Sequence, residues 1–392
     1  MNLVIKNARL IDCTGGAPVP SASVQIDKGI ITWIGEETAR PFKHTHQEEI
    51  EARGLTLIPG MIDCHEHFTG DGGLGPMNNL LNDTPETFTM KAIGNCKRAL
   101  ISGVTSARDV GARYAINILI AKETASGAIP GPRIIAAGEW LQMPGTWPPA
   151  LTQRIETAED LGAAVRKQID KGAGLIKIGA TGFDANREQF ASMSPEALGV
   201  AVHTAHAAGL TIAAHCVGFE GTKNSVEAGI DSIEHGTFID EETVQLMVEK
   251  GTYLVPTLST WDARLRLSKE LGVSKKEIGE VEHLKENSQA SFRRAHKAGV
   301  RIAAGTDAGG SPARHGFFPR EIELMVETGM SPVEALESAT RVAADLLGIQ
   351  RHVGTIEVNK QADLVLIDGD PHSDPSALRN VWAVFQNGIR IR

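Results

Sequence analysis

Two histidines one residue apart end an apolar run early in the chain. The run Gly60-Met-Ile-Asp-Cys-His-Glu-His-Phe68 contains His65 and His67. If the run is a strand, residues two apart point to the same face and are separated by about 6.6 Å along the strand. One metal ion can bridge such a pair, but a histidine at a strand end can equally be a hydrogen-bonded structural residue. The pair alone leaves both interpretations open.

Four further residues with metal-binding or acid–base chemistry end later apolar runs. They are Lys177 in LIKIGA, His215 in LTIAAHC, His235 in SIEHGT and Asp307 in VRIAAGTD. Each has a structural interpretation by itself: a lysine can extend along apolar surface, and an aspartate can cap a turn. An unpartnered buried charge, however, is costly, and imidazole with carboxylate binds divalent transition metals. Six such residues at strand ends favour a metal site.

The elements between residues 56 and 349 explain how these residues would meet. Apolar runs alternate with helical stretches such as Ala158–Lys171 and Pro195–Ala208, in eight strand–helix units. Continuous apolar strands with crossover helices form a parallel sheet, and eight such units close into a barrel. An open doubly wound sheet is the alternative, but the chain lacks GxGxxG and GxxxxGK[ST]. We predict an α/β fold with a (β/α)8 TIM barrel, whose strand ends bring the six residues together.

The two ends of the chain have a different pattern of short strands separated by turns. LVIKNARLID and ASVQIDKGIITWIGE stand at one end, and VGTIEVNK, ADLVLIDGD and VWAVFQNGIRIR at the other. Because chain termini often lie close together, residues 1–55 and 350–392 are predicted to complete one small β-sandwich. Residues 56–349 then form the barrel. Segment 259–290 is too long for a plain connection and is predicted to be a lid, with a solvated helical hairpin as the alternative.

Composition limits the functional class. The chain has 392 residues, a net charge of −9 and 42% hydrophobic residues, values typical of a soluble enzyme. It has no basic run for nucleic acid and no apolar stretch near the roughly 18 residues of a membrane span. The N-terminus has no secretory core, and the four cysteines form no CxxC pair, so a cytoplasmic location is expected. The expected partner is a small-molecule substrate; the sequence leaves homo-oligomer formation open.

The motifs at the ends of the predicted strands, in the order in which they occur, resemble those of the amidohydrolase superfamily. They most resemble its imidazolonepropionase-like and Xaa-Pro dipeptidase-like branch. The resemblance covers essentially the whole chain, from LIPGMIDCHEH through IEHGT and GTDAG to ADLVLIDGDP. It implies a binuclear metal centre, usually with zinc. By this resemblance, His65, His67 and Asp307 bind one ion, and His215 and His235 bind the other. Lys177 would bridge both ions as a carbamate formed with CO2.

Electrostatics makes such a bridge reasonable. Two divalent cations about 3.5 Å apart repel each other by roughly 19 kcal/mol at an effective dielectric constant of 20, so anions are needed between them. A lysine that burial makes neutral can add CO2 and become anionic. The expected reaction is hydrolysis of an amide-type C–N bond by a metal-bridging hydroxide, in an N-acyl amino acid, a peptide-like compound or a cyclic amide. Asp307 is the expected general base and acid.

The substrate is harder to predict. In the dipeptidase-like members, a Gly-Gly-His loop and a tyrosine polarise the substrate carbonyl; this chain has GEWLQMPGTWPPA and Val217 at those places. Trp140 and Trp147 are candidates to hold a bulky acyl group, and Arg314 and His315 to reach the substrate from the barrel rim. Ordinary loop packing and a solvated surface arginine are the alternatives. An Xaa-Pro-type dipeptidase, a carbamate, lactone or phosphotriester hydrolase, a mononuclear deaminase and a non-catalytic barrel remain open, although Lys177 speaks against the deaminase.

Overall fold

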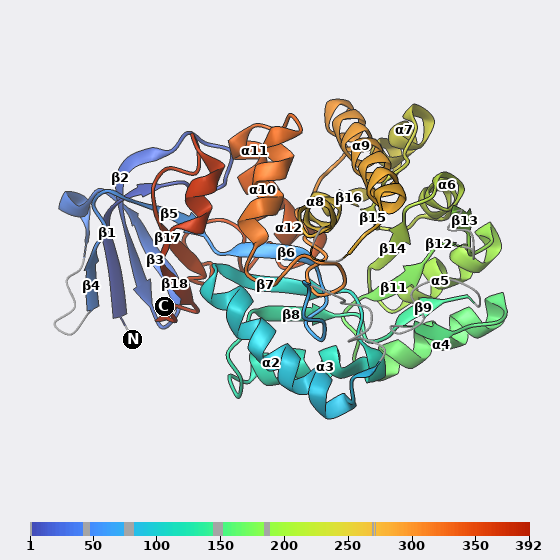
Figure 1. Cartoon of the computed structure of the whole chain (residues 1–392). Coiled ribbons are helices and arrows are strands. Elements are labelled where there is room, and N and C mark those ends of the chain that lie inside the picture. The colour runs from blue at the N-terminus through green and yellow to red at the C-terminus, as the bar shows by residue number, and fades with distance from the viewer. Residues whose placement is uncertain are drawn as a thin grey trace. The chain divides into compact units, whose positions relative to one another are not determined.

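The computed structural model describes residues 2–41, 48–73, 82–143, 152–183, 189–268, 270 and 272–392. The chain divides into two compact units (Figure 1). The smaller unit comprises Met1–Asp63, Lys97–Ser106 and Gly316–Arg392, and the larger unit comprises Cys64–Cys96 and Ala107–His315.

The smaller unit contains an eight-stranded sheet built from both ends of the chain. Its strands are β1 (Asn2–Leu10), β2 (Val19–Asp27), β3 (Ile30–Gly35), β4 (Glu48–Glu51), β5 (Leu55–Pro59), β17 (Leu364–Asp368), β18 (Val381–Gln386) and β19 (Ile389–Arg390). The strand order is β19-β18-β17-β5-β1-β2-β3, and β4 pairs with β1. The unit also contains α10 (Phe318–Glu327), α11 (Pro332–Ser338), α12 (Arg341–Leu346) and the short turns η1 (Glu37–Ala39) and η4 (Pro375–Arg379).

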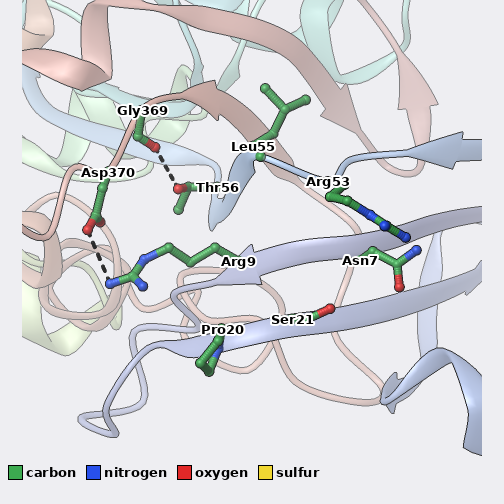
Figure 2. A pocket seen from close by; sticks show the side chains of 10 residues that line it. Asn7, Arg9, Pro20, Ser21, Arg53, Leu55, Thr56, Gly369 and Asp370 are labelled. Carbon is green, nitrogen blue, oxygen red and sulfur yellow. Dashed lines mark hydrogen bonds and ion pairs between the residues drawn. The ribbon is translucent and has the colours of Figure 1, made fainter.

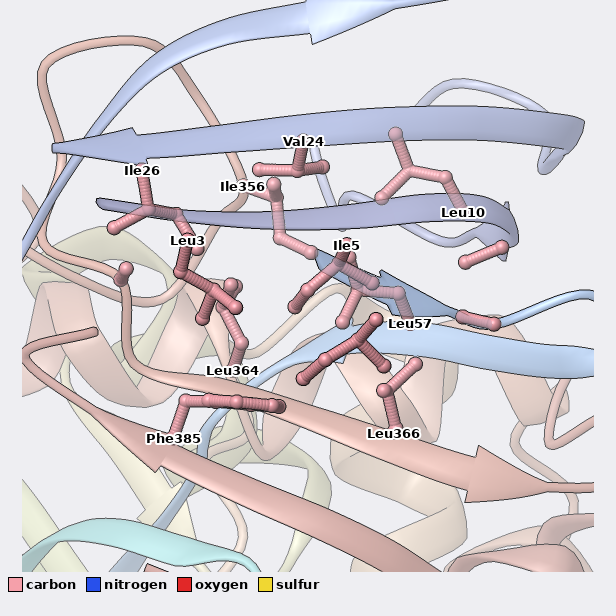
Figure 3. Packing of buried hydrophobic residues seen from close by; sticks show 14 of the residues in the cluster. Leu3, Ile5, Leu10, Val24, Ile26, Leu57, Ile356, Leu364, Leu366 and Phe385 are labelled. Carbon is pink, nitrogen blue, oxygen red and sulfur yellow. The ribbon is translucent and has the colours of Figure 1, made fainter. Parts of the chain in front are cut away.

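One apolar core holds this sheet together (Figure 3). Leu3 and Ile5 on β1 and Leu364 and Leu366 on β17 are each two residues apart, so they share a face and pack into the same buried cluster. The predicted β-sandwich, with strands from both termini, is confirmed. The alternating pattern was sufficient to predict it because every second residue must enter the core.

Two stretches differ from the sequence-based expectation. VGTIEVNK is not a strand: Gly354 and Asn359 have φ values of 93° and 76°, which an extended chain does not allow. The apolar run around Gly60 is two strands rather than one, because β5 belongs to this sheet and β6 begins at Met61. A Cβ atom at Gly60 would lie 2.0 Å from Oγ1 of Thr105, so this junction requires glycine.

A cavity of about 570 Å³ lies beside β1 in the smaller unit (Figure 2). It lies where β1 changes its parallel partner from β4 to β5. Arg9 and Asp370 form an ion pair of 3.2 Å at its wall, and the hydroxyl of Thr56 donates to the carbonyl of Gly369. The cavity contains none of the six predicted metal ligands.

The barrel lies mainly in the larger unit. Its strands are β6 (Met61–Glu66), β7 (Val104–Asp109), β8 (Arg133–Ala136), β11 (Ile176–Gly179), β14 (Ile212–Cys216), β15 (Ser232–His235) and β16 (Tyr253–Val255). Of these, Met61–Asp63 and Val104–Ser106 belong to the smaller unit. Segment 301–308 follows β16 and pairs through single bridges at Ile302 and Ala308. Strands β11, β14, β15 and β16 pair in parallel. Backbone hydrogen bonds close the ring, including Leu254 N to Arg301 O at 2.9 Å and Asp307 N to His65 O at 2.7 Å. The predicted (β/α)8 barrel is confirmed.

Helices alternate with these strands along the chain (Figure 1). They are α2 (Pro85–Ile101), α3 (Ile116–Ala125), α4 (Ala158–Asp170), α5 (Pro195–Ala207), α6 (Phe219–Ala228), α7 (Glu241–Lys250), α8 (Leu258–Arg266) and α9 (Lys275–Ala298), with the turn η2 (Arg113–Ala115). Short strands β9 (Trp140–Gln142), β10 (Thr152–Arg154), β12 (Thr181–Phe183) and β13 (Gln189–Ala191) follow barrel strands. Capping boxes begin α4 at Thr157 and α9 at Ser274, which gives both helices a defined start.

Two expectations from composition concern disulfide bonds and membrane-spanning helices. Cys13, Cys64, Cys96 and Cys216 are buried and free of disulfides. Burial raises the pKa of the Cys216 thiol to about 12, so this neighbour of His215 is a thiol at neutral pH. Among the described residues, no helix is both long and apolar enough to span a membrane.

Candidate metal centre

The barrel strands bring the predicted ligands into one cluster. His65 lies near the end of β6 and His67 directly follows it, His215 lies near the end of β14, and His235 is the last residue of β15. The ring centroids of His65 and His67 are 5.5 Å apart, those of His65 and His235 are 5.0 Å apart, and those of His215 and His235 are 4.6 Å apart. Lys177 on β11 is fully buried and lies close enough to lower the pKa of all four imidazoles.

Three of these residues match the geometry of a metal site. The Nε2 atoms of His65 and His67 lie 3.6 and 3.5 Å from Oδ1 of Asp307, and all three ligand atoms lie within 4.8 Å of one another. Around a tetrahedral zinc ion with ligand bonds near 2.1 Å, ligand atoms stand about 3.4 Å apart. The side chains therefore have the spacing that a divalent cation requires, and the donor set of two imidazoles and a carboxylate suits such an ion.

Backbone strain occurs at the same place. His235 and Asp307 have φ values of 69° and 57°, in the left-handed region that residues other than glycine seldom adopt. Each such residue costs of order 1–3 kcal/mol, and such residues are retained mainly where function needs the side chain in that direction. The strain supports a functional role for both residues.

Hydrogen bonds orient the imidazole rings. Nδ1 of His65 lies 2.6 Å from Oε2 of Glu234, and Nδ1 of His67 lies 2.8 Å from the carbonyl oxygen of Gly111. A carboxylate and a carbonyl can only accept, so Nδ1 donates in both cases and Nε2 is the unprotonated nitrogen that faces Asp307. Nδ1 of His235 shares a hydrogen bond of 2.7 Å with the hydroxyl of Thr257.

Burial sets the charge state of the cluster. It lowers the pKa of His67 to about 4 and that of His215 to about 3, and it lowers the pKa of His65 and His235 well below the ordinary value. The histidines are therefore neutral at pH 7, the form that binds metals. Burial also lowers the pKa of Lys177 to about 8, although Glu234 opposes this shift. Nζ of Lys177 has no hydrogen-bond partner among the residues that the structure describes.

A buried ion pair that was not predicted from the sequence supports the cluster. Arg108 on β7 donates from Nη2 to Oε1 of Glu234 at 2.6 Å and from Nε to the carbonyl oxygen of Cys64 at 2.6 Å. Glu234 thus joins Arg108 to His65. A signal was present, because TSARDV and SIEH each place a charge inside a buried strand, and buried charges are paired.

Replacing Glu234 tests this support. We expect Glu234→Gln to weaken metal binding about 10-fold to 100-fold, because the variant loses the charge that holds His65 and balances Arg108. Competition with a chromophoric chelator measures the affinity. Glu242→Gln is the matched control, since exposed Glu242 pairs with surface Lys223, 2.8 Å away. Equal affinities in the two variants would contradict the role of Glu234.

The residues predicted to bind substrate occupy different environments. Trp140 is buried, with its ring centroid 5.0 Å from that of His215 and 5.3 Å from Nζ of Lys177, so it lies beside the ligands. Val217 is buried in an apolar cluster with Trp261. Trp147 lies outside the described residues.

The two candidates after the eighth strand differ from each other. Arg314 is exposed. The substrate contact expected of His315 stays a prediction: this residue is buried, with Nδ1 2.6 Å from Oε2 of Glu66 and Nε2 2.8 Å from the carbonyl oxygen of Gly70. Both ring nitrogens thus contact the chain that follows β6. This favours a role in holding that loop, and a residue in an irregular loop cannot be placed by strand periodicity.

The chain is similar to known proteins both in sequence and in structure. The profile of the Amidohydrolase family matches residues 56–389. Ochratoxinase from Aspergillus niger is 31% identical over 404 residues, covering 94% of this chain and 82% of that protein. Imidazolonepropionase from a Geobacillus species is 23% identical over 415 residues, covering 93% and 91%. The solved structure of a Xaa-Pro dipeptidase with methionine bound in its active site has a TM-score of 0.90 and 30% identity, with full coverage of both chains.

Proposed function

The chain belongs to the amidohydrolase family, and from this premise we propose that it hydrolyses an amide-type C–N bond of a small molecule with two divalent metal ions. The resemblance inferred from the sequence motifs is confirmed at the level of the family and its dipeptidase-like branch. The single observation that carries the proposal is the spacing of 3.5 and 3.6 Å between Oδ1 of Asp307 and the two Nε2 atoms of His67 and His65.

The proposed centre assigns each ligand to an ion. His65, His67 and Asp307 would hold the first ion, and His215 and His235 would hold the second. Zinc is the proposed metal because neutral imidazoles and a carboxylate suit it. Lys177 is proposed to bridge the two as a carbamate. Its burial and its pKa of about 8 support this role, because they leave roughly a tenth of the amine neutral at pH 7 and able to react with CO2.

The proposed chemistry divides the work between metals and protein. Bound ions of this kind polarise a carbonyl and lower the pKa of a water to about 7. Asp307 takes the proton of the attacking water and passes it to the leaving amine. Glu234 keeps the Nε2 atom of His65 directed at Asp307, and the neutral imidazoles avoid placing further positive charge beside the ions.

The proposed substrate is an N-acyl amino acid or peptide-like compound with a bulky acyl group. Trp140 supports this choice, because its indole lies beside His215 and presents apolar surface next to the ligands. A relative named ochratoxinase and a structural neighbour named Xaa-Pro dipeptidase indicate that related sites accept quite different amides. Xaa-Pro dipeptidase activity is the second candidate, favoured by the structural similarity to the Xaa-Pro dipeptidase. Val217 speaks against it, because this residue is buried among apolar side chains and offers no hydroxyl to polarise a carbonyl.

A substrate panel tests the proposal. Metal-replete protein is assayed with N-acyl amino acids, Xaa-Pro dipeptides, cyclic amides, carbamates, lactones and phosphotriesters, and deamination is followed by ammonia release. We expect the highest kcat/KM for N-acyl amino acids with an aromatic acyl group. Trp140→Ala should lower that value about 10-fold relative to the acetyl compound, because the acyl group loses its aromatic contact.

The control for this experiment is a tryptophan far along the chain. Trp382 on β18 is 40% exposed, so Trp382→Ala should leave the preference between acyl groups unchanged. Faster hydrolysis of Xaa-Pro dipeptides than of all other compounds would replace the first candidate by the second. Hydrolysis of none of the amides would contradict the proposed function.

A further inference from the structure

Three hydroxyl residues at the start of α8 bond to the segments that carry His235 and Asp307. Thr257 shares a hydrogen bond with His235, and the hydroxyl of Ser259 donates to the carbonyl oxygen of Thr306 at 2.9 Å. The hydroxyl of Thr260 donates to Oδ2 of Asp307 at 3.2 Å. All three hydroxyl residues are buried. The first turn of α8 therefore contacts two predicted metal-binding segments at once.

Helix α9 fixes α8 in this position. The side chain of Asp262 on α8 is 6% exposed and pairs with Lys285 on α9 at 3.4 Å. On α9, the hydroxyl of Ser291 donates to the carbonyl oxygen of Thr237, 2.9 Å away, in the loop that follows His235. These bonds hold α8 and α9 against the segments that carry His235 and Asp307. They favour a fixed support for these segments, in place of the lid predicted for segment 259–290.

The two carboxylate oxygens of Asp307 have different surroundings. Oδ1 faces His65 and His67, whereas Oδ2 accepts the hydrogen bond from Thr260. A Cβ atom at Gly310 would lie 2.5 Å from Oδ1, so the glycine leaves room for the carboxylate on that side. The torsion that turns an aspartate carboxylate is broad and roughly two-fold. Rotation about it is therefore limited by contacts such as the bond from Thr260.

We propose that Thr260 is a positioning residue for Asp307. Its hydroxyl holds Oδ2, which keeps Oδ1 directed at the first metal site and orients the carboxylate for proton transfer. The acceptor is a charged carboxylate, so loss of this hydrogen bond has a measurable effect even at its length of 3.2 Å. The inference rests on the proposed function, because it assigns Thr260 a part in the same reaction.

Two substitutions separate the hydroxyl from the volume of the side chain. Thr260→Val keeps the shape and removes the donor, and Thr260→Ser keeps the donor. We expect Thr260→Val to lower kcat about 10-fold to 100-fold with KM within about twofold of the wild type, and Thr260→Ser to restore kcat. Thr328→Val is the control, since buried Thr328 donates to Leu324 of its own helix at 2.6 Å.

A second measurement needs no substrate. The visible spectrum of protein reconstituted with Co²⁺ reports ligand geometry; it should change in Thr260→Val and return in Thr260→Ser, with equal cobalt content in both variants. Wild-type spectrum and kcat in Thr260→Val would overturn the role of Thr260. A wild-type protein that binds Co²⁺ but hydrolyses no amide would overturn the proposed function, while the spectra would still support or overturn the contact between Thr260 and Asp307.

Discussion

Asp307→Asn should lower kcat about 10³-fold while the protein keeps its fold. The amide oxygen of asparagine can still face His65 and His67, but an amide cannot take up the proton of the attacking water or return it to the leaving amine. General acid–base catalysis typically contributes between about 10² and 10⁴ in rate, which sets the expected size. The measurement is kcat with the best substrate of the panel, at matched metal content.

The control variant also replaces an aspartate by asparagine, but at a residue outside the cluster of predicted ligands. Asp231→Asn removes a surface carboxylate that accepts from His206 at 2.9 Å and from the backbone N–H of Ile212 at 2.8 Å. This variant tests whether losing any carboxylate of the larger unit lowers activity. Near-normal kcat in Asp307→Asn with metals bound would show that another group moves the proton.

Lys177→Met should reduce the bound metal from two ions to one per chain and lower turnover about 10³-fold. Methionine is close to lysine in length but cannot add CO2, so the site would lose the carbamate charge that would offset the repulsion between the two cations. Inductively coupled plasma mass spectrometry gives the stoichiometry. Lys223→Met, at a partly exposed residue on α6 that pairs with Glu242, should keep both ions.

The pH dependence of reconstitution offers an independent check on Lys177. Only the neutral amine reacts with CO2, and the pKa of Lys177 is about 8 because burial disfavours the ammonium. At a constant concentration of dissolved CO2, the rate at which apo-protein gains activity with Zn²⁺ should fall about tenfold per pH unit below that pH and level off above it. A rate that does not depend on bicarbonate at any pH would exclude the carbamate.

The barrel and the ligand cluster could be predicted because the spacing of apolar residues, and the place of a residue within its strand, are visible in the local sequence. Alternation along β6 puts His65 and His67 on one side, with Glu66 on the other, where it meets His315. The ends of parallel barrel strands must then converge. These two rules were sufficient to bring residues from five strands together without knowledge of any contact.

The remaining features depend on contacts between distant residues. The pairing of Arg108 with Glu234 joins positions 126 residues apart, and no local pattern specifies it. The bond from Thr260 to Asp307 and the burial of His315 depend on loops after the strands, where periodicity ends. The need for glycine at position 60 depends on Thr105, whose hydroxyl would lie 2.0 Å from a Cβ atom there. Each of these features requires the folded structure.

The most direct test of the account is the metal content of the purified protein together with its amide hydrolysis before and after chelation. The account predicts two divalent ions per chain, loss of hydrolysis when a chelator removes them, and recovery when Zn²⁺ and bicarbonate are restored. Undiminished hydrolysis of amides by protein from which all metal has been removed would contradict it.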